Sequence, residues 1–245
     1  MSWTSHRLTS GSVAIVQTAV VSSAAITCPV AGAPDIGYHA IPMDLDTLRG
    51  RLRARPTTPR SEWDSREPGD TNPAPSVDSP RPAAVLMPLY FDLDEWHLLL
   101  TQRTETVSTH KGQVAFPGGR ADPEDRDAVA TALREAEEEI GLQSANVDVL
   151  GYLDDLITVT RYRVTPVVAR IDWPVPLRLS EFELSSVFGV PVRWLADPAH
   201  RVVEYRDPPV PGPRLEVIHW PFQGYDIWGA SARMISNLLD VWLSP

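Results

Sequence analysis

The most constraining feature of this sequence is the acidic stretch Arg134–Leu142, REAEEEIGL. Glutamates crowd into it with Arg134 as the only neighbour of opposite sign. A helix would place Glu135, Glu138 and Glu139 on one face, because side chains three and four residues apart are neighbours there. Oxygen ligands of this kind suit Mg²⁺, which often bridges protein carboxylates to substrate phosphates. The stretch therefore predicts a metal-binding helix, and the alternative is a solvated acidic surface.

The residues around this stretch predict where the helix begins and ends. Asp122 and Asp127 are both candidate N-caps, and Gly141 is a natural C-terminal residue because glycine readily becomes left-handed. The expected buried stripe comprises Ala128, Val129, Ala132, Leu133 and Ala136. Upstream, Phe116–Gly119 predicts a tight loop in which Gly118 and Gly119 let backbone amides approach an anion. The order is thus strand, glycine loop and metal-binding helix.

The whole segment resembles the Nudix box, G-x5-E-x7-R-E-U-x-E-E-x-G-U, in which U is a bulky apolar residue. Its second half matches from Arg134 onward, with the small Ala136 at the first U position. Its first half departs, because Arg126 stands at the early Glu position and Arg120 at the Gly position. Two shifted alignments fit if one or two extra residues precede Arg134: Gly119 with Asp125, and Gly118 with Glu124.

Flanking motifs resemble the coenzyme A pyrophosphatase branch of the Nudix hydrolases. They are Leu98–Arg103 (LLLTQR), His110–Gly119 (HKGQVAFPGG), Ser180–Phe188 and Tyr225–Ala230. The resemblance implies an α/β fold, an α/β/α sandwich with a mixed β-sheet between helices. It also implies cleavage of coenzyme A or its thioesters to 3′,5′-ADP and a 4′-phosphopantetheine product, with Mg²⁺ or Mn²⁺ as cofactor. Such an enzyme would meet its substrate in the cytoplasm.

The same resemblance assigns roles to individual residues. It implies metal binding by Glu135, Glu138 and Glu139, with Arg134 orienting a carboxylate through a bidentate pair. Glu137 falls at a variable position and is expected to be a solvated charge. The general base is expected outside the box, where Glu183 is the first candidate and Glu181 the second, each weighed equally against an ordinary surface carboxylate. The expected substrate contacts are Arg103, His110, Lys111, Gly118 and Gly119.

The net charge and the cysteine count exclude some classes of binding partner and of structural site. The net charge of −10 argues against a nucleic-acid groove or an anionic membrane surface. It also means that metal ions would have to mediate binding of a polyanionic small molecule. Cys28 is the only cysteine, so neither an intrachain disulfide nor a cysteine zinc cluster is expected. A homodimer, another Nudix substrate such as ADP-ribose or a dinucleotide, and a non-catalytic nucleotide-binding module all stay open.

The chain is expected to have three parts. Residues 1–42 lack the patterning of an enzyme and predict a disordered tail or mistranslated leader, with a weak signal peptide as a further option. Residues 43–83 predict a short helix over Asp44–Arg55 followed by a Pro-rich linker. Residues 84–243 predict the hydrolase domain. Its expected strands are 83–91, 96–102, 111–115, 147–159, 162–171, 202–205 and 215–220, with a helical turn at 191–196 and a final helix at 230–243.

Overall fold

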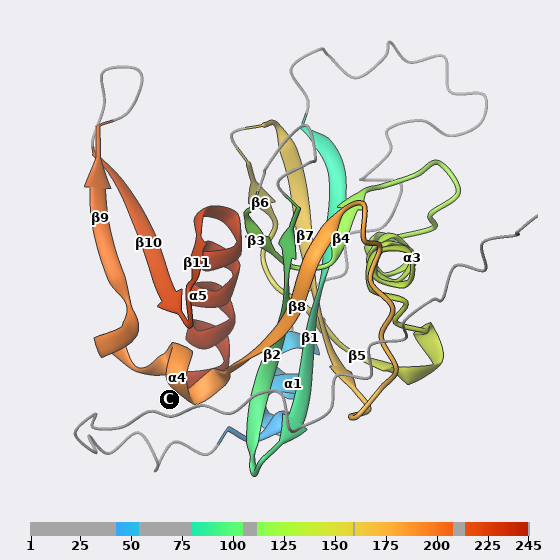
Figure 1. Ribbon diagram of the computed structural model, residues 1–245, viewed down its shortest axis with the longest axis horizontal. Helices are drawn as coiled ribbons and strands as arrows, with labels where there is room; N and C mark the ends of the chain where they lie inside the picture. Colours follow the sequence, from blue (N-terminus) through green and yellow to red (C-terminus); the bar gives the residue numbers. More distant parts are fainter. Residues whose placement is uncertain (1–42, 54–79, 105–111, 159, 208–213, 245) are drawn as a thin grey trace, which may run out of the picture.

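A mixed β-sheet forms the centre of the molecule (Figure 1). The computed structural model describes residues 43–53, 80–104, 112–158, 160–207 and 214–244. The main path of the sheet runs β3-β2-β1-β7-β5, and β4, β6 and β8 pair with β1, β7 and β2 respectively. Among the described strands of this sheet only β1 and β7 pair in parallel, and the other pairs are antiparallel. The strands are β1 Arg81–Asp92, β2 Glu95–Arg103, β3 Val114–Ala115, β4 Gly118–Arg120, β5 Val147–Tyr152, β6 Leu156–Ile157, β7 Tyr162–Ile171 and β8 Leu184–Pro191.

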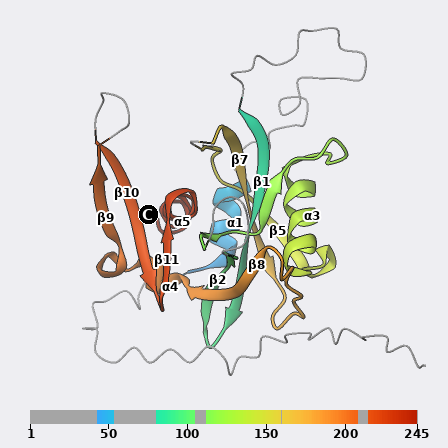
Figure 2. The ribbon, with the colours of Figure 1, turned by 45° about the horizontal axis from the view of Figure 1, so that its top comes forward.

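Helices cover both faces of this sheet (Figures 1 and 2). Helix α3, Ala128–Ile140, packs on one face, where its alanines meet Leu86 and Leu99. Helices α1, Leu45–Arg53, and α5, Gly229–Leu243, pack on the other face in a second apolar cluster. Alternate residues of β1 and β2 supply the two clusters, as the period of a strand requires. The expected α/β/α sandwich with a mixed sheet is therefore confirmed.

A smaller antiparallel sheet, β11-β10-β9, lies beside α5. Its strands are β9 Val202–Arg206, β10 Leu215–Phe222 and β11 Tyr225–Trp228. A short helix α4, Val192–Ala196, and two 3₁₀ turns, η3 at Ser144–Asn146 and η4 at Pro198–His200, complete the described elements. Strand β10 is joined to the core by Trp220, which is 1% exposed and donates from its indole nitrogen to the Leu195 carbonyl at 3.1 Å.

Several expected elements differ from the structure. The extended piece 147–159 is broken into β5 and β6, because the chain leaves the edge of β7 between them. The loop expected at Phe116–Gly119 is wrong in its second half, since Gly118 and Gly119 belong to strand β4 and pair with Val85 and Ala84. Strand β8 was not expected at all. The other expected strands and helices agree with the structure to within a few residues.

The N-terminal predictions are only partly within the described residues. The helix expected at 44–55 is present as α1, where Leu48 and Leu52 are fully buried in the main core. The predicted tail at 1–42 and most of the predicted linker lie outside the described residues. The three-part division of the chain stays a prediction. Across the described ranges, no helix has both the length and the apolarity needed to cross a membrane.

Candidate active site at the acidic helix

Helix α3 has a defined cap at each end. Asp127 is the N-cap, and its side chain accepts a hydrogen bond from the Ala130 amide at 2.8 Å, so the later of the two candidate caps is the one used. Gly141 ends the helix in the left-handed region at φ 69°, and its amide donates to the Glu137 carbonyl at 2.9 Å. These local signals fix the rotation of the helix and hence which glutamates meet the sheet.

Glu135 and Glu139 are the two glutamates that face strand β4. The Gly118 amide donates to Glu139 Oε2 at 3.1 Å. A Cβ atom at Gly119 would lie 2.5 Å from Glu135 Oε1, and one at Gly118 would lie 2.4 Å from the Ala84 carbonyl oxygen. Only glycines therefore allow the two carboxylates and strand β1 to come so close to β4. The backbone amide expected to approach an anion does so, and that anion is the carboxylate of Glu139.

Burial sets the protonation of both carboxylates. Glu139 has only 7% of its side chain exposed. Burial raises its pKa to about 7, the Gly118 amide opposes the rise, and the nearby Glu135 carboxylate adds to it. Burial also raises the pKa of Glu135, against the effect of Arg134. The one cation within 4 Å of Glu139 among the described residues is Arg103, whose Nη1 lies 3.6 Å from Oε1. Two neighbouring carboxylates with raised pKa values are stabilised in their charged form by further positive charge.

Arg134 is held by a carboxylate that the resemblance did not assign. Its Nε and Nη2 donate to Asp125 Oδ1 and Oδ2 at 3.1 and 2.9 Å, a bidentate pair. Asp125 also accepts from the Thr131 hydroxyl and the Asp122 amide, each at 2.9 Å. Burial by itself raises the pKa of Asp125, but these hydrogen bonds outweigh burial and hold the pKa below its ordinary value. Arg134 then donates from Nη1 to Glu135 at 3.0 Å.

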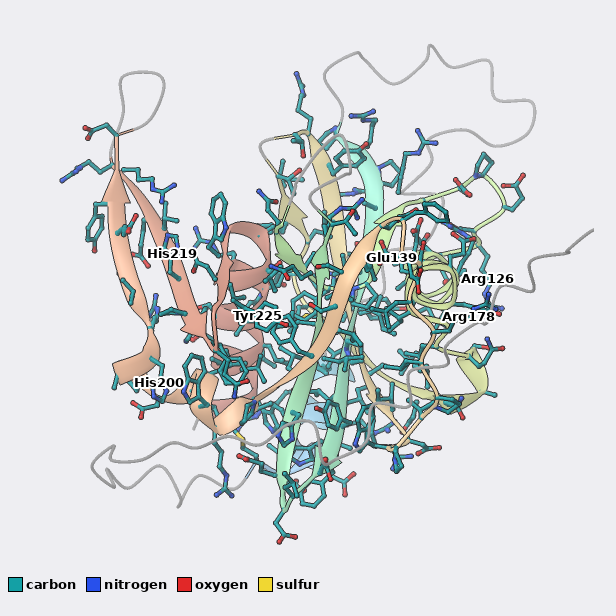
Figure 3. All side chains as sticks on the ribbon, in the orientation of Figure 1. Arg126, Glu139, Arg178, His200, His219 and Tyr225 are labelled. Atoms are coloured by element: carbon teal, nitrogen blue, oxygen red, sulfur yellow. The ribbon has the colours of Figure 1, made fainter. Side chains whose placement is uncertain are left out.

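This geometry decides between the alignments of the acidic box. Asp125 occupies the place of the early Glu, paired with the box arginine, and Gly119 the place of the first Gly. The segment between Asp125 and Arg134 is one residue longer than the pattern. Arg126, at the unshifted position, is 83% exposed on the outer side of α3, away from Glu139 (Figure 3). The bidentate pair expected between Arg134 and a carboxylate is present, and its carboxylate is Asp125.

Glu138 is placed differently from the other two predicted metal ligands. Its side chain is 60% exposed, and its Oε2 accepts from Arg134 Nη1 at 3.2 Å. Within the described part of the chain, no three His, Cys, Asp or Glu side chains gather closely enough to hold a metal ion. Of the three carboxylates expected to converge, Glu135 and Glu139 do so and Glu138 does not. Glu137 is exposed and accepts from Gln143 at 3.2 Å, away from the site as expected.

The candidate general base lies on a turn beside Glu139. The Ser180 amide donates to the Glu139 carbonyl and the Thr104 amide donates to the Glu183 carbonyl, both at 2.8 Å. The turn is thereby fixed to α3 and to the residue that follows β2. The Glu183 side chain is exposed, yet its charge is near enough to raise the pKa of Glu139. Glu181 is exposed on the same turn.

The other predicted substrate contacts divide into two groups. Arg103 is at the site, and its buried Nε has no hydrogen-bond partner among the described residues. Gly118 and Gly119 are also at the site, where they contact the two buried glutamates. His110 and Lys111 lie outside the described residues. Asp125 is a candidate site residue that the prediction omitted, and the shifted alignment with Gly119 was the signal for it.

Sequence comparison gives a family and a set of relatives. The family described as "NUDIX domain" matches residues 80–203. "Uncharacterized Nudix hydrolase NudL" of Escherichia coli K12 is 41% identical over 169 residues, covering 67% of this chain and 85% of the relative. The protein of the same name from Photorhabdus laumondii is 39% identical over 161 residues, covering 66% and 84%.

Solved structures are similar at lower identity. A Caenorhabditis elegans Ap4A hydrolase binary complex has 22% identity and a TM-score of 0.40, covering 45% of this chain and 80% of that one. A MutT/nudix family protein from Enterococcus faecalis has 17% identity and a TM-score of 0.44, covering 69% and 64%.

Proposed function

This chain belongs to the NUDIX family, and from that premise we propose that it hydrolyses the diphosphate of coenzyme A or its thioesters. Family membership supports the broader statement that it is a hydrolase of nucleoside diphosphate derivatives. The proposed products are 3′,5′-ADP and 4′-phosphopantetheine or its acylated form. The substrate is therefore a small molecule that carries several phosphates.

The observation that supports this substrate most directly is that two of the flanking motifs, Leu98–Arg103 and His110–Gly119, each supply a residue that contacts Glu139. The first motif supplies Arg103 at 3.6 Å from the carboxylate. The second supplies Gly118, whose amide donates to the same carboxylate at 3.1 Å. Arg103 and Gly118, which precede Glu139 by 36 and 21 positions along the sequence, thus both contact one side chain of the acidic box. The branch motif is then part of the reacting site and not a separate structural element.

The two later stretches that resemble the branch also meet one another. Tyr225 stacks on Phe188 with ring centroids 3.8 Å apart and donates from its hydroxyl to Ser186 at 3.3 Å. Figure 3 shows Tyr225 between the small sheet and β8. This contact joins β8, which begins at the turn of Glu183, to the part of the chain that leads into α5. It supports a single site built from all four stretches.

The residues at the site fit a divalent cation of the kind that Nudix hydrolases generally use. The fit rests on the buried carboxylate of Glu139 and the partly buried one of Glu135, both with raised pKa values, and on a Gly119 whose missing Cβ leaves room for Glu135. Glu135 and Glu139 would hold Mg²⁺ or Mn²⁺, with Glu138 as a third or water-bridged ligand after release from Arg134. A bound divalent cation lowers the pKa of a coordinated water and neutralises phosphate oxygens.

The chain's own residues then have separate tasks. Arg103 binds a phosphate oxygen, because its guanidinium is partly exposed and lies 3.6 Å from the Glu139 carboxylate. Glu183 accepts the proton of the attacking water, since its carboxylate is exposed beside Glu139. Arg134, held by Asp125, keeps Glu135 oriented toward β4. Binding, proton transfer and orientation thus come from three different elements.

The test is a substrate comparison with the 245-residue chain. Coenzyme A, ADP-ribose and NADH are incubated separately with Mg²⁺, with Mn²⁺ and with chelator, and the products are separated by chromatography. We expect metal-dependent 3′,5′-ADP from coenzyme A, and faster turnover of coenzyme A than of the other two compounds.

Each other result has a definite meaning. Preferential cleavage of ADP-ribose or NADH would keep the Nudix chemistry and reject coenzyme A as substrate. No cleavage of any compound, together with nucleotide binding, would favour a non-catalytic module.

A further inference from the structure

Phe182 is the most exposed of the large apolar side chains in the described residues, with 89% of its surface accessible. The next in order are Leu93 at 61% and Tyr205 at 57%. Isolated apolar side chains on a surface are common and need no explanation by themselves. The position of Phe182 is what sets it apart, because it lies on the turn that carries Glu183.

The backbone of this turn is fixed on both sides of the site. The Phe182 carbonyl accepts from the Thr104 hydroxyl at 3.1 Å, and the Glu183 carbonyl accepts from the Thr104 amide at 2.8 Å. On the other side the Ser180 amide donates to the Glu139 carbonyl at 2.8 Å. Figure 3 shows this part of the chain passing beside Glu139 before it enters β8. The turn therefore connects the elements that supply Arg103 and Glu139.

The Phe182 ring lies outside the core, and the residues directly before and after it are charged. Leu184, two positions on, is 3% exposed and anchors the turn in the core of the α3 face. Glu181 and Glu183 on either side of Phe182 are exposed carboxylates. A flat apolar surface is thus presented on an otherwise acidic turn, which is hydrogen-bonded to the Glu139 backbone and carries the Glu183 charge close to the Glu139 carboxylate.

The substrate class supplies a matching group. With its diphosphate held by a divalent cation at Glu135 and Glu139, a nucleoside diphosphate derivative would place its nucleobase one ribose away from these carboxylates. Every nucleobase has a π face, and aromatic side chains stack on such faces with little preference for one base over another. We propose that Phe182 stacks on the nucleobase of the substrate and so determines affinity for the nucleotide half. This rests on the proposed function only for the position of the diphosphate.

The pantetheine half is the other group that could meet an exposed ring, and it makes a different prediction. A pantetheine chain has no π face. A contact between Phe182 and pantetheine would increase the affinity for the other product, 4′-phosphopantetheine. The two products therefore separate the two contacts. AMP and 3′,5′-ADP contain the base without pantetheine, and 4′-phosphopantetheine contains pantetheine without the base.

The experiment is calorimetric titration of the full chain with AMP, 3′,5′-ADP and 4′-phosphopantetheine in Mg²⁺ buffer. The variants are Phe182→Ala and Phe182→Trp, with Phe91→Ala as matched control. Phe91 is also an exposed phenylalanine, at 52%, and it lies at the β1–β2 hairpin. We expect Phe182→Ala to weaken both nucleotides about tenfold. Phe182→Trp should restore wild-type affinity, and Phe91→Ala should change nothing.

The opposite results are equally definite. The proposal is overturned if Phe182→Ala leaves nucleotide binding unchanged, if it weakens 4′-phosphopantetheine instead, or if neither nucleotide binds the wild-type chain. Neither nucleotide contains a diphosphate bond, so binding is measured apart from hydrolysis. Failure of coenzyme A cleavage with Phe182-dependent AMP binding would reject the proposed substrate and keep the stacking contact. With an active enzyme, Phe182→Ala should raise KM about tenfold and change kcat less than twofold.

Discussion

Two carboxylates of this protein are equally buried and have opposite properties. Asp125 and Glu139 have side chains that are 6% and 7% exposed. Asp125 accepts hydrogen bonds from Arg134, Thr131 and the Asp122 amide, and its pKa is lowered in spite of burial. Glu139 accepts one amide hydrogen bond, from Gly118, and burial raises its pKa to about 7. The donors around Asp125 outweigh the effect of burial on its pKa, whereas at Glu139 the effect of burial is the larger.

From this difference we infer that Asp125 is a structural carboxylate of the box and Glu139 a reactive one. A carboxylate with all its oxygens satisfied has nothing left to offer a cation or a substrate. Asp125 therefore serves to fix Arg134, and through it Glu135. Glu139, with Glu135 and Arg103 beside it, keeps capacity for additional positive charge. An incompletely satisfied buried acid next to a second acid is typical of a functional site.

The largest expected effect comes from neutralising the reactive carboxylate. Glu139→Gln should reduce kcat about a thousandfold, about 4 kcal/mol, because the glutamine cannot supply the charge that the site requires. The measurement is steady-state hydrolysis with saturating Mg²⁺. Glu137→Gln is the matched control on the exposed side of the same helix, and it should keep wild-type turnover. Retained turnover in the Glu139 variant would contradict the metal-ligand assignment.

The same variant should show a pH-dependent gain in stability. The folded pKa of Glu139 is about 7 and the reference value is 4.5, so between these values the folded chain holds a proton that the unfolded chain has lost. Stability therefore falls as pH rises through this window, by about 3 kcal/mol in total. In chelator, Glu139→Gln should be more stable than wild type at pH 8 and equal to it near pH 4. Denaturant unfolding at the two values checks this; a constant difference would contradict the raised pKa.

Removing the structural carboxylate should act on stability first. Asp125→Asn leaves Arg134 without its bidentate partner and should lower the free energy of unfolding by about 2 kcal/mol, since Arg134 keeps some access to water. Asp122→Asn is the matched control, because Asp122 is half exposed and 3.9 Å from Arg134. The control should cost under about 0.5 kcal/mol. Equal costs for the two variants would mean that the bidentate pair does not fix the helix.

The smallest effect concerns the turn beside Glu139. Glu183→Gln should slow turnover about tenfold, the low end for a base that water can partly replace. It should also lower the pKa of Glu139, because the Glu183 charge contributes to the rise. The pH–rate profile measures both effects, and Glu181→Gln is the control on the same turn. A tenfold loss with Glu181→Gln and none with Glu183→Gln would exchange the two assignments.

The acidic helix was predictable because its signals are local. Asp127, Gly141 and the alanine stripe fix its ends and its buried side within the segment itself. The spacing of Glu135 and Glu139 then follows from helix geometry alone. Neither strand β8 nor strand β4 has a comparable local signal. Strand β8 reads LSSVFGVP and becomes a strand by pairing with β2 along its length, and β4 is mostly glycine.

The sequence by itself determined the family, the α/β class, the helix and the residues that could bind a metal. Only the tertiary structure decided that Asp125 holds Arg134, that Glu138 turns to Arg134, and that Arg103 and Gly118 share Glu139. The tertiary structure also explains why position 189 is glycine, since a Cβ there would lie 1.8 Å from the hydroxyl of Tyr90 on another strand. Helix spacing is set by bonds along the chain. The number of hydrogen bonds that a buried carboxylate accepts depends on donors from distant segments of the chain. No local sequence pattern specifies that number.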